Sequence, residues 1–502
     1  MRFYIPVVVT LLALLAIEVA FLPMPGIQED EALFLLPFLH GHPQLYSWTV
    51  GNVQVPLMLS EYIGALKTWV YWPIFRVWQP SIWSIRLPVC FFSLLTVWIL
   101  AEFLKRAVSA GVALITVLLL ATDASFVLTN VFDWGPVSLL LLSTVLFLYL
   151  FRLFLDSGER FALGAAFLVA GIATWYKTLF LVLVAAMALS CLLVFWGRLR
   201  ERMQPSNILV ALLSFAIGAT PLITFNLQRG GATITKGLNL PAVKASEKMM
   251  MLQHTLDGRA LEHYMFRSLP GETIALNGAP LAELVSHWYE RSSFRPAGPL
   301  LPALMLALIA LPFLRNSVLF SPLLFAWIAF ATAEAAMLCF RDAGAGPHHT
   351  VLLYPAPQFI VAASAWAFAE RVRWPMAVWA IAFVIAAGNL WLLRSYQEAG
   401  KQNGFSVYWT DGVGNLAGII AATHLPVAIL DWGIQNGVQV QTNDQVEIVE
   451  PTPIRPGVLY VAHCEGYTII ESRSKPYEPL LRQVRIVTDR LGAPLFCLFE
   501  KQ

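Results

Sequence analysis

Three consecutive carboxylates, Glu29, Asp30 and Glu31, follow the first apolar segment of this chain. An ionisable group at the edge of a membrane is costly to place there, so such a group is a candidate for function. A simpler interpretation makes Asp30 the N-cap of a helix that runs to about Leu39, with Glu31 in its first turn. A cap explains one acid well and three acids poorly. The sequence therefore favours a functional site at this triplet.

The composition defines the class of protein that must position these acids. Hydrophobic residues make up 58% of the 502 positions and only 13% are charged, and the mean hydropathy is +0.66. These values are typical of a polytopic helical membrane protein. The first apolar run lacks a small-x-small cleavage site after it, so we expect it to be retained. About eleven runs are long enough to cross a bilayer: 4–22, 82–104, 108–121, 137–154, 161–176, 179–196, 208–225, 300–314, 318–340, 350–368 and 374–393.

Basic residues predict the orientation of the chain. With these spans they fall on one side of the membrane, which the positive-inside rule makes cytoplasmic, together with the N-terminus. The other side carries two long loops, about 24–81 and 226–299, and the C-terminal segment 394–502. No dense basic tract indicates a nucleic-acid partner. The cytoplasmic set is Arg2, Lys105, Arg106, Arg152, Arg160, Arg198, Arg200, Arg202, Arg315, Arg371 and Arg373.

The external loops are predicted to stay close to the membrane. Aromatic residues crowd residues 62–83, which is typical of interfacial helices. Lys67 and Arg76 in this stretch either bind lipid phosphate or extend towards the headgroups. The methionine-rich residues 244–266 predict a second interfacial helix.

The segment 394–502 has a different character and predicts a small α/β domain. Strand-like runs alternate with predicted helices at about 415–423 and after Gly433. Asp431 ends one predicted strand, where it either caps a helix, the favoured role, or faces a ligand. The strand-like runs are 426–430, 458–462, 484–487 and 495–499.

Cysteine and histidine residues give no metal signature. Cys464 and Cys497 lie in the predicted external domain and form either a disulfide or two buried thiols. No Cys/His spacing typical of a metal site occurs, so the sequence predicts neither a metal site nor another cofactor, and it leaves a divalent-ion requirement open.

Several short motifs occur in a defined order relative to the spans. Asp30-Glu31-Ala32 follows the first span, Ser84-Ile85-Arg86-Leu87-Pro88 opens the second, and Asp133 precedes the fourth. Thr174-Trp175-Tyr176-Lys177 ends the fifth, and Gly346-Pro347-His348-His349 precedes the tenth. This order resembles the GT-C fold membrane glycosyltransferases, in particular the bacterial branch similar to protein O-mannosyltransferases and aminoarabinose transferases. The resemblance covers about residues 1–393, which we expect to form the transferase domain, and Asp431-Trp432-Gly433 is similar to the tail of some members.

Two positions depart from the family pattern. Members often carry an arginine three residues before the aspartate that Asp133 resembles, and Asn130 stands there instead. The segment around Lys177 is similar to a Leu-Thr-Lys-Gly motif, with Thr178 in place of the glycine.

The resemblance implies inverting transfer of a sugar from a polyisoprenyl phosphate to an acceptor hydroxyl on the extracytoplasmic face, in a bacterial inner membrane. A hydroxyl is a weak nucleophile, so a carboxylate acts as general base. We assign this role to Asp30, with Glu31 orienting the acceptor. Cations stabilise the leaving phosphate. The expected phosphate-binding set is Arg86, Lys177, Lys67, His348 and His349, and Asp133 is a further candidate site residue.

Two alternatives remain open at this stage. The chain could bind or transport a lipid-linked sugar without chemistry, or act as a lipid-linked oligosaccharide ligase or polymerase. Transporters often show inverted repeats and place ionisable residues near the bilayer midplane. The sequence shows no internal repeat and its acids cluster at one boundary, which favours an enzyme. The acceptor is a protein, a glycolipid or a glycan.

Overall fold

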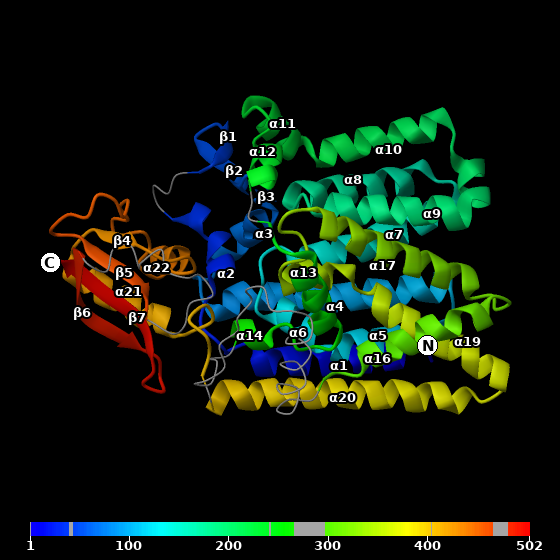
Figure 1. Cartoon of the computed structure of the whole chain (residues 1–502). Coiled ribbons are helices and arrows are strands. Elements are labelled where there is room, and N and C mark those ends of the chain that lie inside the picture. Colours follow the sequence, from blue (N-terminus) through cyan, green and yellow to red (C-terminus); the bar gives the residue numbers. More distant parts are fainter. Residues whose placement is uncertain (1, 40–43, 240–241, 266–296, 403, 465–479) are drawn as a thin grey trace.

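A computed structural model describes residues 2–39, 44–239, 242–265, 297–402, 404–464 and 480–502. Figure 1 shows a bundle of long helices with a small sheet-containing domain at one end. The N-terminus lies at the opposite end of the bundle. Part of the predicted external loop 226–299 lies outside the described residues.

Each predicted apolar run is helical, but not every run forms a full-length span. Among the described residues, seven helical segments are long and apolar enough to cross a membrane, or nine if each of two bent pairs counts as one span. The remaining difference from the predicted eleven comes from two shorter apolar helices, α8 (Arg160–Tyr176) and α16 (Leu300–Ala310) with η2 (Leu311–Leu314). The longer helices are α1 (Tyr4–Phe21), α4 (Ile82–Ala107), α7 (Val137–Ser157), α9 (Phe180–Arg202), α17 (Phe320–Cys339), α19 (Ala356–Val372) preceded by α18 (Pro347–Thr350) and η3 (Val351–Leu353), and α20 (Pro375–Gln402).

Two predicted spans are bent. Helices α10 (Pro205–Gly218) and α11 (Thr220–Gln228) meet at 67°, and α5 (Ala110–Thr122) and α6 (Ala124–Val131) meet at 60°. Asp123 separates the second pair because its carboxylate accepts a hydrogen bond from the N–H of Phe126 and starts a new helix. The carboxylate is held in turn by Tyr354 and Gln358 of the η3–α19 region. The bend therefore falls where the predicted span 108–121 ends, and it directs α6 towards the domain end of the bundle.

The predicted first external loop contains a sheet that was not predicted from the sequence. Strands β1 (Tyr46–Val50), β2 (Val53–Ser60) and β3 (Ile63–Gly64) pair antiparallel in that order. They follow α2 (Glu29–Leu33) and η1 (Leu36–Phe38) and precede α3 (Leu66–Phe75), which lies where an interfacial helix was predicted. An isolated bridge joins Ile63 to Lys177, so that this sheet reaches the end of α8.

The predicted second external loop contributes α12 (Ala232–Asn239), α13 (Ala245–Leu256) and α14 (Glu262–Met265). Helix α13 lies within the predicted methionine-rich interfacial helix. Its Leu252 and Leu256 are buried, and Lys248 donates from its ammonium group to the carbonyls of Met337 and Phe340. Helix α13 is thus fixed to the end of α17.

The C-terminal segment forms the predicted α/β domain. Its sheet has the order β4-β5-β7-β6, with β4 parallel to β5 and the other pairs antiparallel. A disulfide joins Cys464 to Cys497, which resolves the alternative that the sequence left open. The elements are α21 (Gly412–Thr423), β4 (Val427–Ile429), α22 (Gln435–Gln441), β5 (Leu459–His463), β6 (Leu481–Thr488) and β7 (Pro494–Lys501).

Candidate active site

The acid triplet forms the first turns of α2, and its three side chains have different partners. The N-cap is Gln28 and not Asp30, which corrects the capping interpretation. The Gln28 side chain accepts from the N–H of Asp30 at 2.6 Å, and Glu31 reaches back to the N–H of Gln28 at 2.8 Å. Successive helical residues point about 100° apart, so Glu29, Asp30 and Glu31 face three different surroundings.

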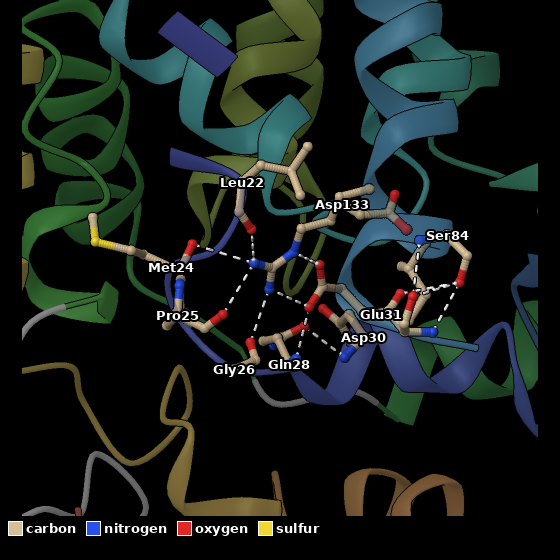
Figure 2. Close-up of polar contacts among 12 residues, drawn as sticks. Leu22, Met24, Pro25, Gly26, Gln28, Asp30, Glu31, Ser84 and Asp133 are labelled. Atoms are coloured by element: carbon tan, nitrogen blue, oxygen red, sulfur yellow. Dashed lines mark hydrogen bonds and ion pairs between the residues drawn. The ribbon is translucent and has the colours of Figure 1, made fainter. Parts of the chain in front are cut away.

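Glu31 pairs with Arg86 in a fully buried ion pair (Figure 2). The guanidinium donates from Nε to Glu31 Oε1 at 2.6 Å and from an Nη atom to Oε2 at 2.8 Å. Its remaining hydrogen bonds go to the carbonyls of Leu22, Met24, Pro25 and Gly26. Arg86, expected at the phosphate, instead fixes the turn between α1 and α2 to helix α4.

A second buried ion pair lies at the end of α6. Asp133 accepts from Lys67 Nζ at 2.5 Å and from the Tyr71 hydroxyl at 2.8 Å. Lys67 also donates to the carbonyl of Gly135. Burial raises the pKa of Asp133 to about 7 although Lys67 opposes the shift, and burial lowers the pKa of Lys67. The ion pair between Lys67 and Asp133 therefore fixes the loop between α6 and α7 to helix α3.

The loop between α6 and α7 contains Trp134, which contacts Asp30 and His348. Asp133 has a φ of 47°, a left-handed conformation that is unusual outside glycine, and its two hydrogen-bonded side-chain contacts hold it there. The Trp134 side chain, next in the chain, hydrogen-bonds to Asp30. Its ring stacks on His348 with centroids 5.2 Å apart.

A cavity of about 460 Å³, named the polar cavity for the charged side chains among its lining residues, lies between the end of the bundle and the C-terminal domain. Asp30, Lys177, His348 and His349 all line it, so four of the predicted site residues meet there. Glu31, Arg86, Lys67 and Asp133 do not line it and form the two ion pairs behind its wall. Other lining residues include Glu29, Tyr62, Trp134, Tyr264, Asp342, Tyr408, Trp409, Trp432 and Asn436.

Two of the charged groups that line the cavity, Asp30 and Lys177, influence each other. Burial raises the pKa of the Asp30 carboxyl, while the charges of Lys177 and Lys67 and the hydrogen bond from Trp134 oppose the shift. Burial lowers the pKa of Lys177 to about 8, and Asp30 and Asp342 oppose that change. Within the described chain, the Nδ1 atoms of His348 and His349 have no hydrogen-bond partner. The cavity thus combines a carboxylate, an ammonium group and polar imidazole atoms.

A second cavity and the arrangement of possible metal ligands were compared with the polar cavity. Another cavity, of about 420 Å³, lies among α4, α7, α9 and α17, but its walls are mostly apolar and it shares no lining residue with the polar cavity. In the described ranges, no group of three or more His, Cys, Asp or Glu residues is arranged to hold a metal ion. Asp30, Lys177, His348 and His349, whose side chains are suited to acid–base chemistry, line the polar cavity.

Sequence reasoning missed several lining residues, although some carried a signal. Glu29 belongs to the acid triplet, Trp134 follows Asp133, and Asp342 lies a few residues before the His348-His349 motif. Trp432 is part of the Asp431-Trp432-Gly433 motif, for which only a role of Asp431 was considered. Tyr408 and Asn436 gave no signal, because only the folded domain brings them to the cavity.

Comparison with known proteins identifies the class of fold. The chain has the architecture of the GT-C membrane glycosyltransferases, as its motifs predicted. The profile of the dolichyl-phosphate-mannose-protein mannosyltransferase family matches residues 65–223. No curated protein sequence matches the chain with significance.

Two solved structures illustrate the likeness. The crystal structure of ArnT from Cupriavidus metallidurans bound to undecaprenyl phosphate superposes with a TM-score of 0.58 at 12% identity, covering 98% of this chain and 97% of that chain. The apo oligosaccharyltransferase of Archaeoglobus fulgidus gives a TM-score of 0.50 at 12% identity, covering 91% of this chain and 69% of that chain. At this identity the likeness shows the fold.

Proposed function

We propose that this protein transfers a sugar from a polyisoprenyl phosphate to an acceptor hydroxyl on the extracytoplasmic face of a bacterial inner membrane, with inversion at the anomeric carbon. The observation that carries the proposal is the meeting of Asp30 and Lys177 in one polar cavity at the end of a GT-C bundle. The ArnT structure, which holds undecaprenyl phosphate, supports a lipid-linked donor.

The proposed step is a single displacement. The acceptor oxygen forms a bond to the anomeric carbon, the bond from that carbon to the phosphate oxygen breaks, and the electron pair stays with the leaving polyprenyl phosphate. Asp30 takes the proton of the acceptor hydroxyl. Because burial raises its pKa, its carboxylate is a stronger base than an exposed aspartate, which favours proton transfer near neutral pH.

The leaving phosphate gains negative charge during this step. Lys177 is 5% exposed, and an ammonium group in such a water-poor position stabilises developing charge more than one in bulk water. His348 and His349 supply further donors on the same side of the cavity. In this proposal Lys67, Arg86, Glu31 and Asp133 act by positioning the groups that touch substrate.

Asp30→Asn tests the proposal. The change keeps the shape and the backbone contacts of α2 and removes the proton acceptor. The measured quantity is the rate at which polyprenyl phosphate is released from the sugar-loaded carrier. This rate should be at least about 10²-fold lower in the variant than in the wild type, while the thermal midpoint in detergent changes little. The assay uses undecaprenyl-phosphate-linked mannose, glucose and 4-amino-4-deoxyarabinose with purified full-length chain, and a bacterial membrane extract supplies the acceptor hydroxyls.

Asp411→Asn is a matched control, because Asp411 is an exposed external aspartate that does not line the cavity. It should keep wild-type turnover. Full activity in Asp30→Asn would remove Asp30 as the base. A wild-type protein that binds these donors and releases polyprenyl phosphate from none of them would favour a binding or transport protein instead.

A further inference from the structure

The outer wall of the polar cavity is aromatic and comes from the C-terminal part of the chain. Tyr408 and Trp409 lie between α20 and α21, and Trp432 lies between β4 and α22. Trp432 is 47% exposed, more than any other aromatic residue of this lining. An indole that is open to a cavity, and not packed into a core, is available for contact with a ligand.

The ring is held on a rigid support. Asp431 accepts from the N–H of His463 at 2.8 Å, and the carbonyl of Trp432 lies 3.0 Å from His463 Nε2, so β5 fixes this turn. Gly433 has a φ of +91°, and a Cβ there would lie 2.9 Å from the Tyr408 ring. The glycine therefore allows Tyr408 to approach, with its ring centroid 5.7 Å from that of Trp432.

The turn that carries Trp432 leads into α22, and the start of α22 is hydrogen-bonded to Glu29 of the acid triplet. The carboxylate of Glu29 accepts from the backbone N–H of Asn436 at 3.1 Å and of Gly437 at 3.4 Å, at the start of α22. Figure 1 shows α2 and α22 next to each other at the domain end of the bundle. The contact therefore ties the segment that follows Trp432 to α2, and both Trp432 and the proposed base Asp30 line the cavity.

These groups match the chemistry of a sugar ring. One face of a pyranose presents C–H groups, which pack well on an aromatic ring, while its edge presents hydroxyls that need polar partners. Asn436, Glu29 and Asp30 line the same cavity as Trp432 and supply such partners. Ligand sites commonly combine a large apolar surface with a few well-placed polar groups.

We propose that Trp432 and Tyr408 form a carbohydrate-stacking subsite for the acceptor, so that the acceptor hydroxyl belongs to a pyranose ring of a glycan or glycolipid. This inference rests on the proposed function. The ring stacks on Trp432 with a hydroxyl directed to Asp30, and the donor phosphate lies against Lys177 on the bundle wall.

Saturation-transfer NMR on the full-length protein in detergent tests the subsite directly. The probes are methyl α-D-mannopyranoside, methyl β-D-glucopyranoside and methyl α-D-galactopyranoside, which carry no phosphate and cannot act as donors. At least one should receive saturation on its ring C–H protons. Trp432→Ala should weaken its binding about tenfold, whereas Trp432→Phe, which keeps an aromatic face, should retain it.

Trp78→Ala is the matched control, because Trp78 is 44% exposed but does not line the cavity, and it should bind the glycoside as the wild type does. Equal binding by Trp432→Ala, or no binding of any glycoside to the wild type, would overturn the subsite. Two other outcomes would also overturn it. One is that a serine- and threonine-containing peptide binds at the site while no glycoside does. The other is that an undecaprenyl-phosphate sugar displaces the glycoside, which would place the donor sugar on the Trp432 ring.

The two proposals can fail separately. The Asp30→Asn variant should still bind the glycoside, because the stacking ring is unchanged and an asparagine amide can still hydrogen-bond a sugar hydroxyl. If the wild type shows normal turnover but no glycoside binding, the subsite is wrong and the proposed transferase function is unaffected. If Asp30→Asn shows unchanged turnover, Asp30 is not the base and the glycoside-binding result is unaffected.

Discussion

Lys177 shows how a single residue sets the conditions under which the site can work. It must be charged to oppose a developing phosphate charge, yet burial lowers its pKa to about 8, with Asp30 and Asp342 opposing the shift. A lowered pKa means that the cation is present below about pH 8 and is lost above it. We therefore expect the turnover rate to fall as the pH rises through this value.

Lys177→Arg should move this alkaline limb to higher pH, because a guanidinium group stays charged throughout the range in which an enzyme can be assayed. Initial rates of polyprenyl phosphate release across the pH range, for both proteins, measure the shift. Lys177→Ala should lower the rate throughout. An alkaline limb at the same pH in the arginine variant would show that another group titrates there.

At the scale of elements, Arg86 joins helix α4 to the turn before α2. Arg86→Ala would leave Glu31 buried without its partner and free four carbonyls, and breaking a buried pair in this way typically costs about 3–5 kcal/mol. We expect a large fall in the thermal midpoint and in the yield of folded protein. The KM for the lipid-linked donor should change little in the fraction that folds.

The variant Arg106→Ala provides the comparison, since Arg106 pairs with Asp156 at a partly exposed position and such pairs contribute little. Its thermal midpoint should stay near that of the wild type. An Arg86→Ala protein of normal stability with a much higher donor KM would return Arg86 to the phosphate site.

The same elements show what the sequence could predict. Long apolar runs predicted the helices well because length and hydropathy are local properties, and alternating strand and helix signals predicted the C-terminal domain. The acid triplet was selected as one feature, but helix geometry separates its members. The pairing of Arg86 with Glu31 and of Lys67 with Asp133 depends on packing between elements distant in sequence, so both cations were expected at the phosphate and lie behind the cavity wall instead.

The whole molecule has two chemically different ends. Helix α9 begins shortly after Lys177, at the cavity, and is kinked at Phe195; its 23 residues follow about 34 Å of helix axis at 1.5 Å per residue. It ends in the basic segment from Arg198 to Arg202. At that far end Arg106 and Arg152 pair with Asp156 between α4 and α7. Basic residues thus gather opposite the cavity and the C-terminal domain, as the positive-inside rule requires if the cavity is extracytoplasmic.

This arrangement predicts the sidedness of reporter fusions in bacterial cells. Alkaline phosphatase, which is active only outside the cytoplasm, should be active when fused after Gln502 and inactive when fused after Arg202. Green fluorescent protein should give the opposite pattern at the same two positions, which controls for differences in expression. The reason is that the two positions lie at opposite ends of the bundle, and a cytoplasmic C-terminus would place the basic residues outside. Cytoplasmic signals from both fusions would put Asp30 and Lys177 on the wrong side for an external acceptor, and the proposed transfer reaction would lose its location.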